Sequence, residues 1–241
     1  MSSAYLLLSH GSRDRRPEIA MQQLASLVCQ KLPSEHLVGI AALEMSPQPL
    51  HEQIQQFAKS AFGDCTQSQN ENRLKIIPLF LLPGVHVMTD IPAEVALAQQ
   101  ATGQDIIIEL QPYLGSHPNL EKLLAKQIAA IKAEAWILLA HGSRRPGSQE
   151  TVEAMAASLG AVTAYWAGPP SLESRVKELV TAGYREIAIL PYFLFAGGIT
   201  DAIATSIEEL KLQFSAVNFQ LAKPLGASAE LAELIWDLTQ R

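Results

Sequence analysis

The chain has 241 residues, of which 48% are apolar and 17% are charged, and its formal net charge at pH 7 is −6. This composition excludes an intrinsically disordered chain, because it supplies enough apolar surface for a buried core. The acidic balance argues against a general nucleic-acid binder. No apolar run reaches the ~18 residues of a membrane span, and the first residues lack the basic region and cleavage site of a secretory signal. We therefore expect a cytoplasmic protein that binds neither nucleic acid nor membrane.

The two cysteines, Cys29 and Cys65, form no CxxC pattern. A zinc ribbon or an iron–sulfur cluster needs further closely spaced ligands, so neither can be built from this chain alone. Free thiols are typical of a cytosolic protein.

The first half of the chain alternates short apolar runs with amphipathic segments. Strands are predicted at residues 4–9, 36–43, 75–82 and 105–110, and helices at residues 18–32, 49–62 and 91–102. This β-α-β-α order is typical of a parallel sheet with helices on both faces. The polar stretch at residues 63–73 has no apolar period and is predicted to be a surface loop.

The second half shows the same alternation. Strands are predicted at residues 135–141, 161–167 and 186–195, with a weaker one near 217–221. Helices are predicted from about Gly147, from Ser171, near Thr200 and at the end of the chain.

Three sequence motifs occur twice, in the same order in both halves. The stretch LLLSHGSRDRRP at residues 6–17 returns as LLAHGSRRPGSQ at residues 138–149. The other two pairs are residues 76–91 with 189–203 and residues 111–124 with 222–235. These repeats indicate an internal duplication. We therefore predict two tandem similar α/β domains, each a small parallel sheet flanked by helices, at residues 1–132 and 133–241.

Three polar side chains follow strands of the first predicted sheet. His10 and Glu44 each end a strand, and His86 follows the third strand after a short turn. Ligands of open α/β sheets bind at the carboxyl edge of the strands, so these residues should converge there. Each alone could be structural: a hydrogen-bonded strand-end histidine, a helix-capping glutamate or a helix N-terminal histidine. Together, two imidazoles and a carboxylate suit proton transfer or coordination of divalent iron, cobalt or nickel.

Arginines are concentrated in the two repeated loops. Arg13, Arg15 and Arg16 follow the first HGS motif, and Arg144 and Arg145 follow the second. Helix N-termini are expected just beyond, and their free N–H groups favour anions. The pattern predicts an anionic ligand, although a solvated basic loop is the alternative.

The turn that precedes His86 contains Gly84, which would let backbone approach a flat or bulky ligand closely. The alternative is a simple strand-to-helix turn. His117, which stands before a proline, is a weaker candidate that fits helix entry better.

The motifs SHGSRDRRP, ALEMS and IIPLFLLPGVHVMTDIP occur in this order in the first half. Together they resemble the sirohydrochlorin chelatases, the class II tetrapyrrole chelatases, in their long two-domain form. The resemblance covers nearly the whole chain and implies two similar α/β domains with the active site in a cleft between them. It also implies a lyase that forms metal–nitrogen bonds by inserting iron or cobalt, and in some members nickel, into sirohydrochlorin or a related tetrapyrrole.

The resemblance also implies roles for single residues. The two catalytic histidines of the family fall on His10 and His86, which would also hold the metal, and its acidic residue falls on Glu44. The implied substrate-binding residues are Gly11, Ser12, Arg13, Leu81, Leu82, Pro83, Gly84, Val85, Arg144 and Arg145. One departure is present: many members carry a second acidic residue in a Glu-Pro pair, where this chain has Pro47 or Gln48.

These residues fit the chemistry that the resemblance implies. Sirohydrochlorin is an apolar macrocycle ringed with carboxylates, which suits arginine-rich loops beside an apolar turn. Metallation replaces two pyrrole protons with a metal ion, so the hypothesis is that His10 and His86 present the metal, with His10 the leading acceptor of a pyrrole proton. Glu44 would orient a histidine, take a proton or bind the incoming ion. Fe²⁺ for siroheme, or Co²⁺ for cobalamin, is then a substrate, with no permanent cofactor, and we expect a monomer or homodimer.

The second half keeps His141 but not its partners. Ala167 or a neighbour stands where Glu44 stands in the first half, and Ile199 stands where His86 stands. A single histidine is a poor metal site. We therefore predict one active site, carried by residues 1–132, and a degenerate second domain.

Two other functions remain open. A carrier that binds tetrapyrrole or metal without turnover would need no base, so His10 and Glu44 disfavour it. A phosphohistidine phosphatase also uses a His-Gly pair after its first strand, but it usually has an arginine immediately before the histidine. Here that residue is Ser9, and in the second copy it is Ala140.

Overall fold

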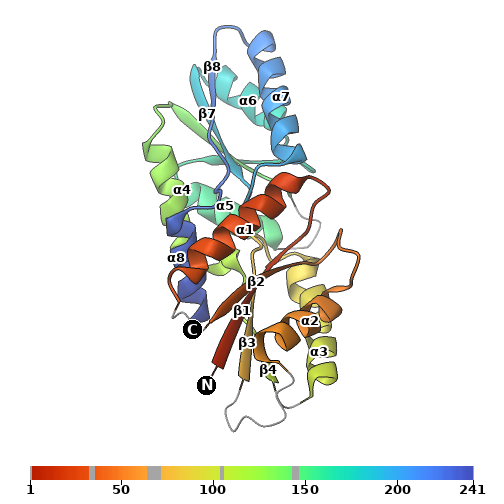
Figure 1. Cartoon of the computed structure of the whole chain (residues 1–241). Coiled ribbons are helices and arrows are strands. Elements are labelled where there is room, and N and C mark those ends of the chain that lie inside the picture. The colour runs from red at the N-terminus through yellow and green to blue at the C-terminus, as the bar shows by residue number, and fades with distance from the viewer. Residues whose placement is uncertain (1, 33–35, 64–71, 104–105, 143–146, 241) are drawn as a thin grey trace. The chain divides into compact units, whose positions relative to one another are not determined.

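The computed structural model describes residues 2–32, 36–63, 72–103, 106–142 and 147–240. The chain forms two compact units, Met1–His117 with Ala227–Arg241 (unit 1) and Pro118–Gly226 (unit 2). Each unit holds one four-stranded parallel sheet. Helices flank the sheet in each unit (Figure 1). The predicted pair of tandem similar α/β domains is confirmed. No helix in the described ranges is long and apolar enough to cross a membrane.

The sheet of unit 1 has the strand order β2-β1-β3-β4, with every neighbouring pair parallel. Its elements are β1 (Ser2–Ser9), α1 (Arg15–Cys29), β2 (Leu37–Ala42), α2 (Leu50–Phe62), β3 (Asn72–Pro78), a π-helical turn η1 (His86–Asp90), α3 (Ile91–Thr102), β4 (Ile106–Leu110), a 3-10 turn η2 (Leu114–Ser116) and α8 (Ala229–Thr239).

The central strand β1 is buried on both faces. Leu6, Leu7 and Leu8 are at most 1% exposed, because helices cover each side of the sheet. On one side Leu6 and Leu8 join a core that includes Ile54 of α2 and Val95 of α3. The chain leaves this buried layer at the carboxyl end of β1, where the exposed His10 follows Ser9.

The sheet of unit 2 has the matching order β6-β5-β7-β8. Its elements are α4 (Leu120–Ala129), β5 (Ala135–Ala140), α5 (Ser148–Ser158), β6 (Val162–Tyr165), α6 (Leu172–Thr181), β7 (Glu186–Tyr192), α7 (Gly198–Gln213) and β8 (Asn218–Leu221). The strand registers agree as well, since Leu8 pairs with Pro78 in the first sheet and Leu139 pairs with Pro191 in the second.

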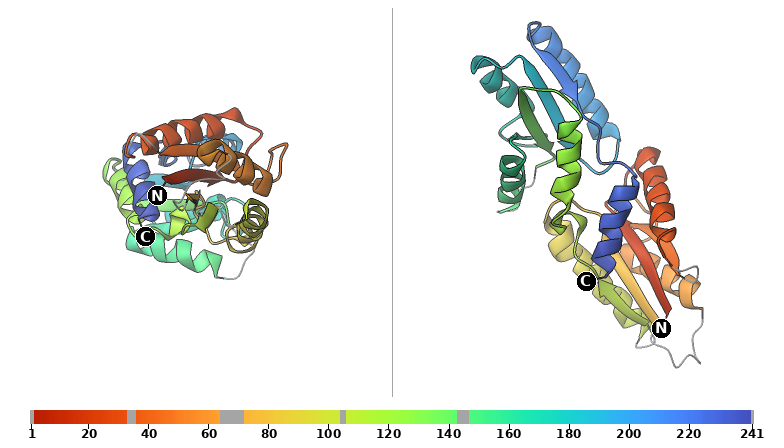
Figure 2. Two further views of the ribbon diagram at one scale, coloured as in Figure 1. Left: turned by 60° about the horizontal axis from the view of Figure 1, so that its bottom comes forward. Right: turned by 90° about the vertical axis from the view of Figure 1, so that its left-hand side faces the viewer.

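The last helix of each repeat lies in the other unit. Helix α4 follows the four strands of the first sheet but belongs to unit 2, and α8 ends the second repeat but belongs to unit 1. The ring of Trp236 on α8 lies 6.2 Å from that of Tyr5, and Lys31 of α1 pairs with Glu233 at 3.0 Å. Figure 2 shows α8 beside α1. The division therefore differs from the expected boundary between residues 132 and 133, which followed chain order rather than helix packing.

The ends of α1 and β3 also differ from the prediction. Helix α1 begins at Arg15 rather than at residue 18, because the carboxylate of Asp14 accepts a hydrogen bond from the backbone N–H of Arg16 and caps the helix. Hydrogen bonds from Arg16 also lower the pKa of Asp14. Strand β3 covers Asn72–Pro78, so it starts within the predicted surface loop and stops four residues before the predicted end. Residues 64–71 of that loop lie outside the described residues.

Two glutamine side chains hydrogen-bond to the backbone of the edge strands of the first sheet. The amide of Gln53 on α2 accepts from the backbone N–H of Ala42 at 3.0 Å and donates to its carbonyl at 2.8 Å. The amide of Gln99 on α3 accepts from Ile108 N–H at 2.8 Å and donates to the Ile106 carbonyl at 2.9 Å. Each amide replaces a neighbouring strand at an otherwise open edge.

Candidate active site

His10 leaves the sheet directly after β1, beside the end of β2. The backbone ladder continues past the strand end, with Leu43 N–H donating to Ser9 at 2.9 Å and Glu44 N–H donating to His10 at 2.8 Å. Gly11 has a φ of +97°, and a Cβ at that position would overlap the Glu44 carbonyl. The glycine therefore allows the two site-bearing segments to lie side by side.

Glu44 stands in a short loop that is held at both ends. The Gln53 side chain binds Ala42 before the glutamate and also donates to the Gln48 carbonyl after it, at 2.9 Å. Met45, the next residue, has a φ of +58°, a left-handed conformation that a non-glycine residue adopts at a cost of order 1–3 kcal/mol. Such strain clusters at functional sites, where the surrounding structure holds the residue in place.

His86 begins the π-helical turn at the head of α3. Ile91 follows Pro78 by 13 positions, whereas the corresponding Ile203 follows Pro191 by 12. From there the buried positions of the two helices run in step, at Ile91, Val95 and Ala98 and at Ile203, Ile207 and Leu210. The first repeat therefore carries one extra residue between strand and helix, and a π-turn accommodates one extra residue. Turns of this kind are frequent at functional sites.

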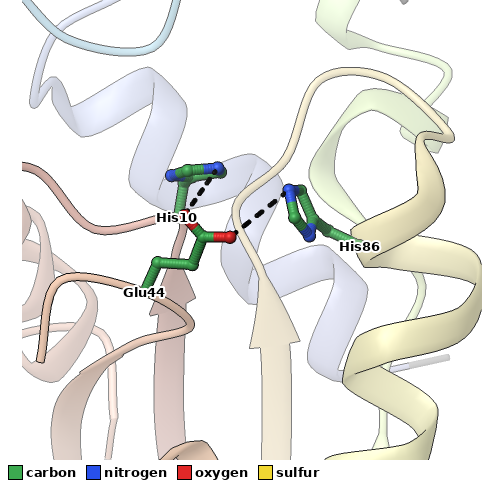
Figure 3. Close-up of side chains that lie close together, drawn as sticks. All are labelled: His10, Glu44 and His86. Carbon is green, nitrogen blue, oxygen red and sulfur yellow. Dashed lines mark ion pairs between the residues drawn. The ribbon is translucent and has the colours of Figure 1, made fainter. Parts of the chain in front are cut away.

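The three predicted residues come together. Nε2 of His10 lies 3.9 Å from Oε2 of Glu44, and Nε2 of His86 lies 4.0 Å from Oε1 of the same carboxylate. The two imidazole rings meet edge to face with centroids 4.9 Å apart. Figure 3 shows both rings turned toward the glutamate. The three side chains are 36–50% exposed, so the site is open to solvent.

This spacing is compatible with the binding of a metal ion. One donor atom from each of the three residues lies within 4.8 Å of the other two, and no other trio of His, Cys, Asp or Glu in the described part of the chain does so. Two metal–ligand bonds of about 2.0–2.2 Å span at most about 4.4 Å, which covers both measured ion-pair distances. Nitrogen and carboxylate donors suit borderline divalent ions such as iron, cobalt and nickel.

The sequence reasoning missed Asp90. Its Oδ2 lies 2.8 Å from Nδ1 of His86, at the other end of the same π-turn. The signal was available, because residues four apart on a helix share a face. A carboxylate behind a histidine fixes which ring nitrogen carries the proton.

One aromatic ring lies near both histidines, and exposed apolar residues lie close in sequence to Glu44 and His86. The Phe80 ring lies 6.3 Å from the ring of His10 and 6.5 Å from that of His86. Met45, Val85 and Met88, which adjoin Glu44 and His86 in sequence, are 57%, 57% and 49% exposed. Large apolar groups exposed next to a polar cluster are typical of a ligand-binding surface.

Comparison with known proteins places the chain in a family. The family model described as CbiX matches residues 4–131 and matches again at residues 135–241. The chain belongs to the CbiX family. The resemblance to the sirohydrochlorin chelatases is thereby confirmed.

Relatives of this CbiX-family chain are named as sirohydrochlorin chelatases. A sirohydrochlorin ferrochelatase of Priestia megaterium is 26% identical over 96% of this chain and 87% of its own length. A sirohydrochlorin cobaltochelatase of the same organism is 22% identical over 95% and 76%. The solved sirohydrochlorin chelatase SirB from Bacillus subtilis subspecies spizizenii, in complex with cobalt, superposes with a TM-score of 0.71 at 21% identity, covering 100% of this chain and 94% of that one. SirB from Bacillus subtilis with Fe³⁺ gives 0.73 at 21% identity, with coverages of 100% and 95%.

The other predicted site residues of this CbiX-family protein differ in exposure, and two of them lie outside the described residues. Ser12 Oγ accepts from Asp14 N–H, so it shapes the entry to α1, and Arg13 is exposed. The apolar run before His86 is half-buried except for the exposed Val85, and consists of Leu81, Leu82, Pro83 and Gly84. Arg144 and Arg145 lie outside the described residues, as does Cys65.

His117 is not part of the cluster. Its side chain is buried in unit 1, with Nε2 3.7 Å from Oδ2 of Asp237 on α8. The weaker site hypothesis for His117 thus has no geometric support, and its backbone N–H caps the turn η2 by donating to Leu114.

The second repeat reproduces the hydrogen bond between the two strand ends but lacks counterparts of the Glu44 and His86 side chains. Ala167 N–H donates to the His141 carbonyl at 2.9 Å, as Glu44 N–H does to His10. Ala167 is therefore the structural counterpart of Glu44. Ile199, the counterpart of His86 counted from the strand, is exposed and apolar.

Proposed function

We propose that this protein inserts a divalent metal ion into sirohydrochlorin with release of two protons. The observation that carries the proposal is the group of His10, Glu44 and His86, whose donor atoms lie within 4.8 Å of one another at the carboxyl edge of the first sheet. The names of the CbiX-family relatives support the same reaction.

In the proposed reaction the metal is a substrate. His10 and His86 hold the ion through their ring nitrogens, and Glu44 contributes a carboxylate oxygen or takes up a proton. Two pyrrole N–H bonds break as metal–nitrogen bonds form, and both protons leave through a base to water. His10 is the leading acceptor of a pyrrole proton once its lone pair has released the metal to the ring, and positioned proton transfer of this kind contributes roughly 10²–10⁴-fold.

The surroundings of the site suit a flat macrocycle. The exposed Met45, Val85 and Met88 offer apolar surface on the segments that carry Glu44 and His86. Leu81, Leu82, Pro83 and Gly84 extend it, and the arginines of the repeated loops would hold the carboxylates at the rim of the ring. Holding ring and metal face to face supplies a proximity effect in addition to proton transfer.

Fe²⁺, for siroheme synthesis, is the first choice of metal. Co²⁺, for cobalamin synthesis, is the second candidate, because a cobaltochelatase is among the relatives and the same donors accept both ions. We propose further that the first repeat carries the one active site and that the second is degenerate, since Ala167 and Ile199 supply no ligands.

The test is anaerobic mixing of the purified protein with sirohydrochlorin and equimolar Fe²⁺, Co²⁺ or Ni²⁺, followed by visible absorption. Metallation faster than the spontaneous rate is expected with at least one metal. Pigment that binds without accelerated metallation would instead identify a carrier.

Alanine variants test the assignment of residues. His10→Ala and His86→Ala should each lower kcat by roughly 10²–10⁴-fold. His141→Ala is the matched control, because the same HGS motif in the second repeat lacks partners, and it should retain the kcat of the unmodified protein. Equal loss in all three folded variants would contradict a single active site.

A further inference from the structure

The two histidines of the site are held differently. Nδ1 of His86 lies 2.8 Å from the Asp90 carboxylate, within normal hydrogen-bond range. Nδ1 of His10 has only the carbonyl of its own neighbour Gly11, at 3.4 Å, which is beyond that range. Only one of the two rings is therefore tethered within the described residues.

The contact with Asp90 determines the proton position on His86. An ionised carboxylate accepts hydrogen bonds and donates none, so the short contact requires that Nδ1 of His86 carries the hydrogen. The lone pair of the neutral ring is then on Nε2. That atom is the one that faces Glu44, 4.0 Å from its Oε1.

The backbone makes the pairing local. His86 and Asp90 are the first and last residues of the π-turn, and the N–H of Ile91 donates to the carbonyl of His86 across it. The extra residue in the first repeat thus places both the histidine and its carboxylate at the head of α3. Asp90 is 42% exposed, so it supports no core and can be replaced without leaving a cavity.

We propose that Asp90 is the positioning residue of His86, which it holds in the Nδ1–H tautomer so that the Nε2 lone pair faces the incoming metal. This role of Asp90 rests on the proposed function. It extends that function by naming a residue that acts through His86 rather than by touching the metal or the tetrapyrrole. Carboxylates behind metal-binding histidines typically change metal affinity by 10–100-fold.

The experiment compares Asp90→Ala and Asp90→Asn with the unmodified protein. The tautomer of His86 is determined from ¹⁵N chemical shifts of its ring without metal, and affinity is measured by titration with Co²⁺ alone. The Nδ1–H form is expected in the unmodified protein and in Asp90→Asn, whose amide oxygen still accepts. Asp90→Ala should show a mixture of tautomers and a Co²⁺ affinity 10–100-fold lower, with Asp90→Asn between the two.

Asp237→Asn is the matched control. It alters another histidine–aspartate pair of unit 1, at 3.7 Å, on helix α8, which carries none of the three site residues. Its Co²⁺ affinity and its His86 tautomer should be unchanged.

Two results would overturn the proposal: an Nε2–H tautomer in the unmodified protein, or an Asp90→Ala variant with unchanged Co²⁺ affinity. Failure of the protein to metallate sirohydrochlorin would contradict the proposed function instead. The tautomer and the Co²⁺ titration would still decide the role of Asp90, because neither measurement requires turnover.

Discussion

Gly11 shows how a single missing side chain shapes the site. The motif suggests that it binds substrate, whereas the structure gives it a contact within the protein, the backbone carbonyl of Glu44. Its counterpart Gly142 has nearly the same φ, +93°, but there a Cβ would meet Cβ of Tyr165 at 3.4 Å, an ordinary contact. Backbone conformation is thus common to both repeats, and the close approach to Glu44 is specific to the first.

Three glycine-to-alanine variants separate these effects. Gly142→Ala should lower the free energy of unfolding by about 1–2 kcal/mol, the cost of a Cβ in the left-handed region. Gly11→Ala should cost more, because it adds a backbone overlap, and should also slow metallation by displacing Glu44. Gly84→Ala should change stability by less than about 0.5 kcal/mol, since no atom lies within 4 Å of the added Cβ. Urea unfolding measures all three, and a Gly11→Ala loss no larger than that of Gly142→Ala would contradict the packing role of Gly11.

Gly84→Ala also tests substrate contact. If the macrocycle lies against the turn before His86, the added methyl group should raise KM for sirohydrochlorin while the free energy of unfolding is unchanged. An unchanged KM would place the ring elsewhere.

At the scale of elements, helix α2 positions the Glu44 loop through Gln53. Replacing Gln53 with Glu keeps the shape but removes the two hydrogen bonds that it donates, to Ala42 and Gln48. The loss should cost about 1–3 kcal/mol, because carbonyl groups lose their partners and face a carboxylate. A displacement of Glu44 by ~1 Å can lower kcat by roughly 10²-fold.

Gln99→Glu is the matched control for this element. Gln99 also pairs through its amide with an edge strand, but it holds β4, which carries none of the three site residues. Both variants should lose similar stability in urea, and only Gln53→Glu should lose metallation activity and Co²⁺ affinity. Equal activity in the two variants would show that the Gln53 amide does not position Glu44.

The elements also show what the sequence could predict. Buried strands and amphipathic helices carry strong periodic patterns, and the carboxyl-edge rule placed His10, Glu44 and His86 together. The π-turn leaves only a one-residue difference in length between repeats, which no periodicity reveals. The pairing of Asp90 with His86 depends on this turn, although the four-residue spacing of the two was visible in the sequence. The side-chain amides of Gln53 and Gln99 each join a helix to the edge of a strand. Such contacts between distant residues have no local sequence pattern.

At the scale of the whole molecule, the sequence repeat and the compact unit do not coincide. The two family matches meet between residues 131 and 135, whereas the final helix of each repeat belongs to the unit of the other. The site-bearing sheet therefore depends on α8, which ends more than a hundred residues after His86 in the chain. Burial of Tyr5 near Trp236 of this helix raises the pKa of the Tyr5 hydroxyl.

This arrangement predicts which strands lose stability when a core residue of helix α8 is replaced. Ile235 of α8 is fully buried, so Ile235→Ala should cost about 2–5 kcal/mol. Hydrogen exchange should show the loss in β1 and β3 of unit 1, because cooperative units open separately. Ile207→Ala on α7, also a buried isoleucine of the second repeat, should instead loosen β5 and β7. If Ile235→Ala loosened β5 and β7 and spared β1 and β3, helix α8 would stabilise its own repeat, and the division into units that joins it to the site would be wrong.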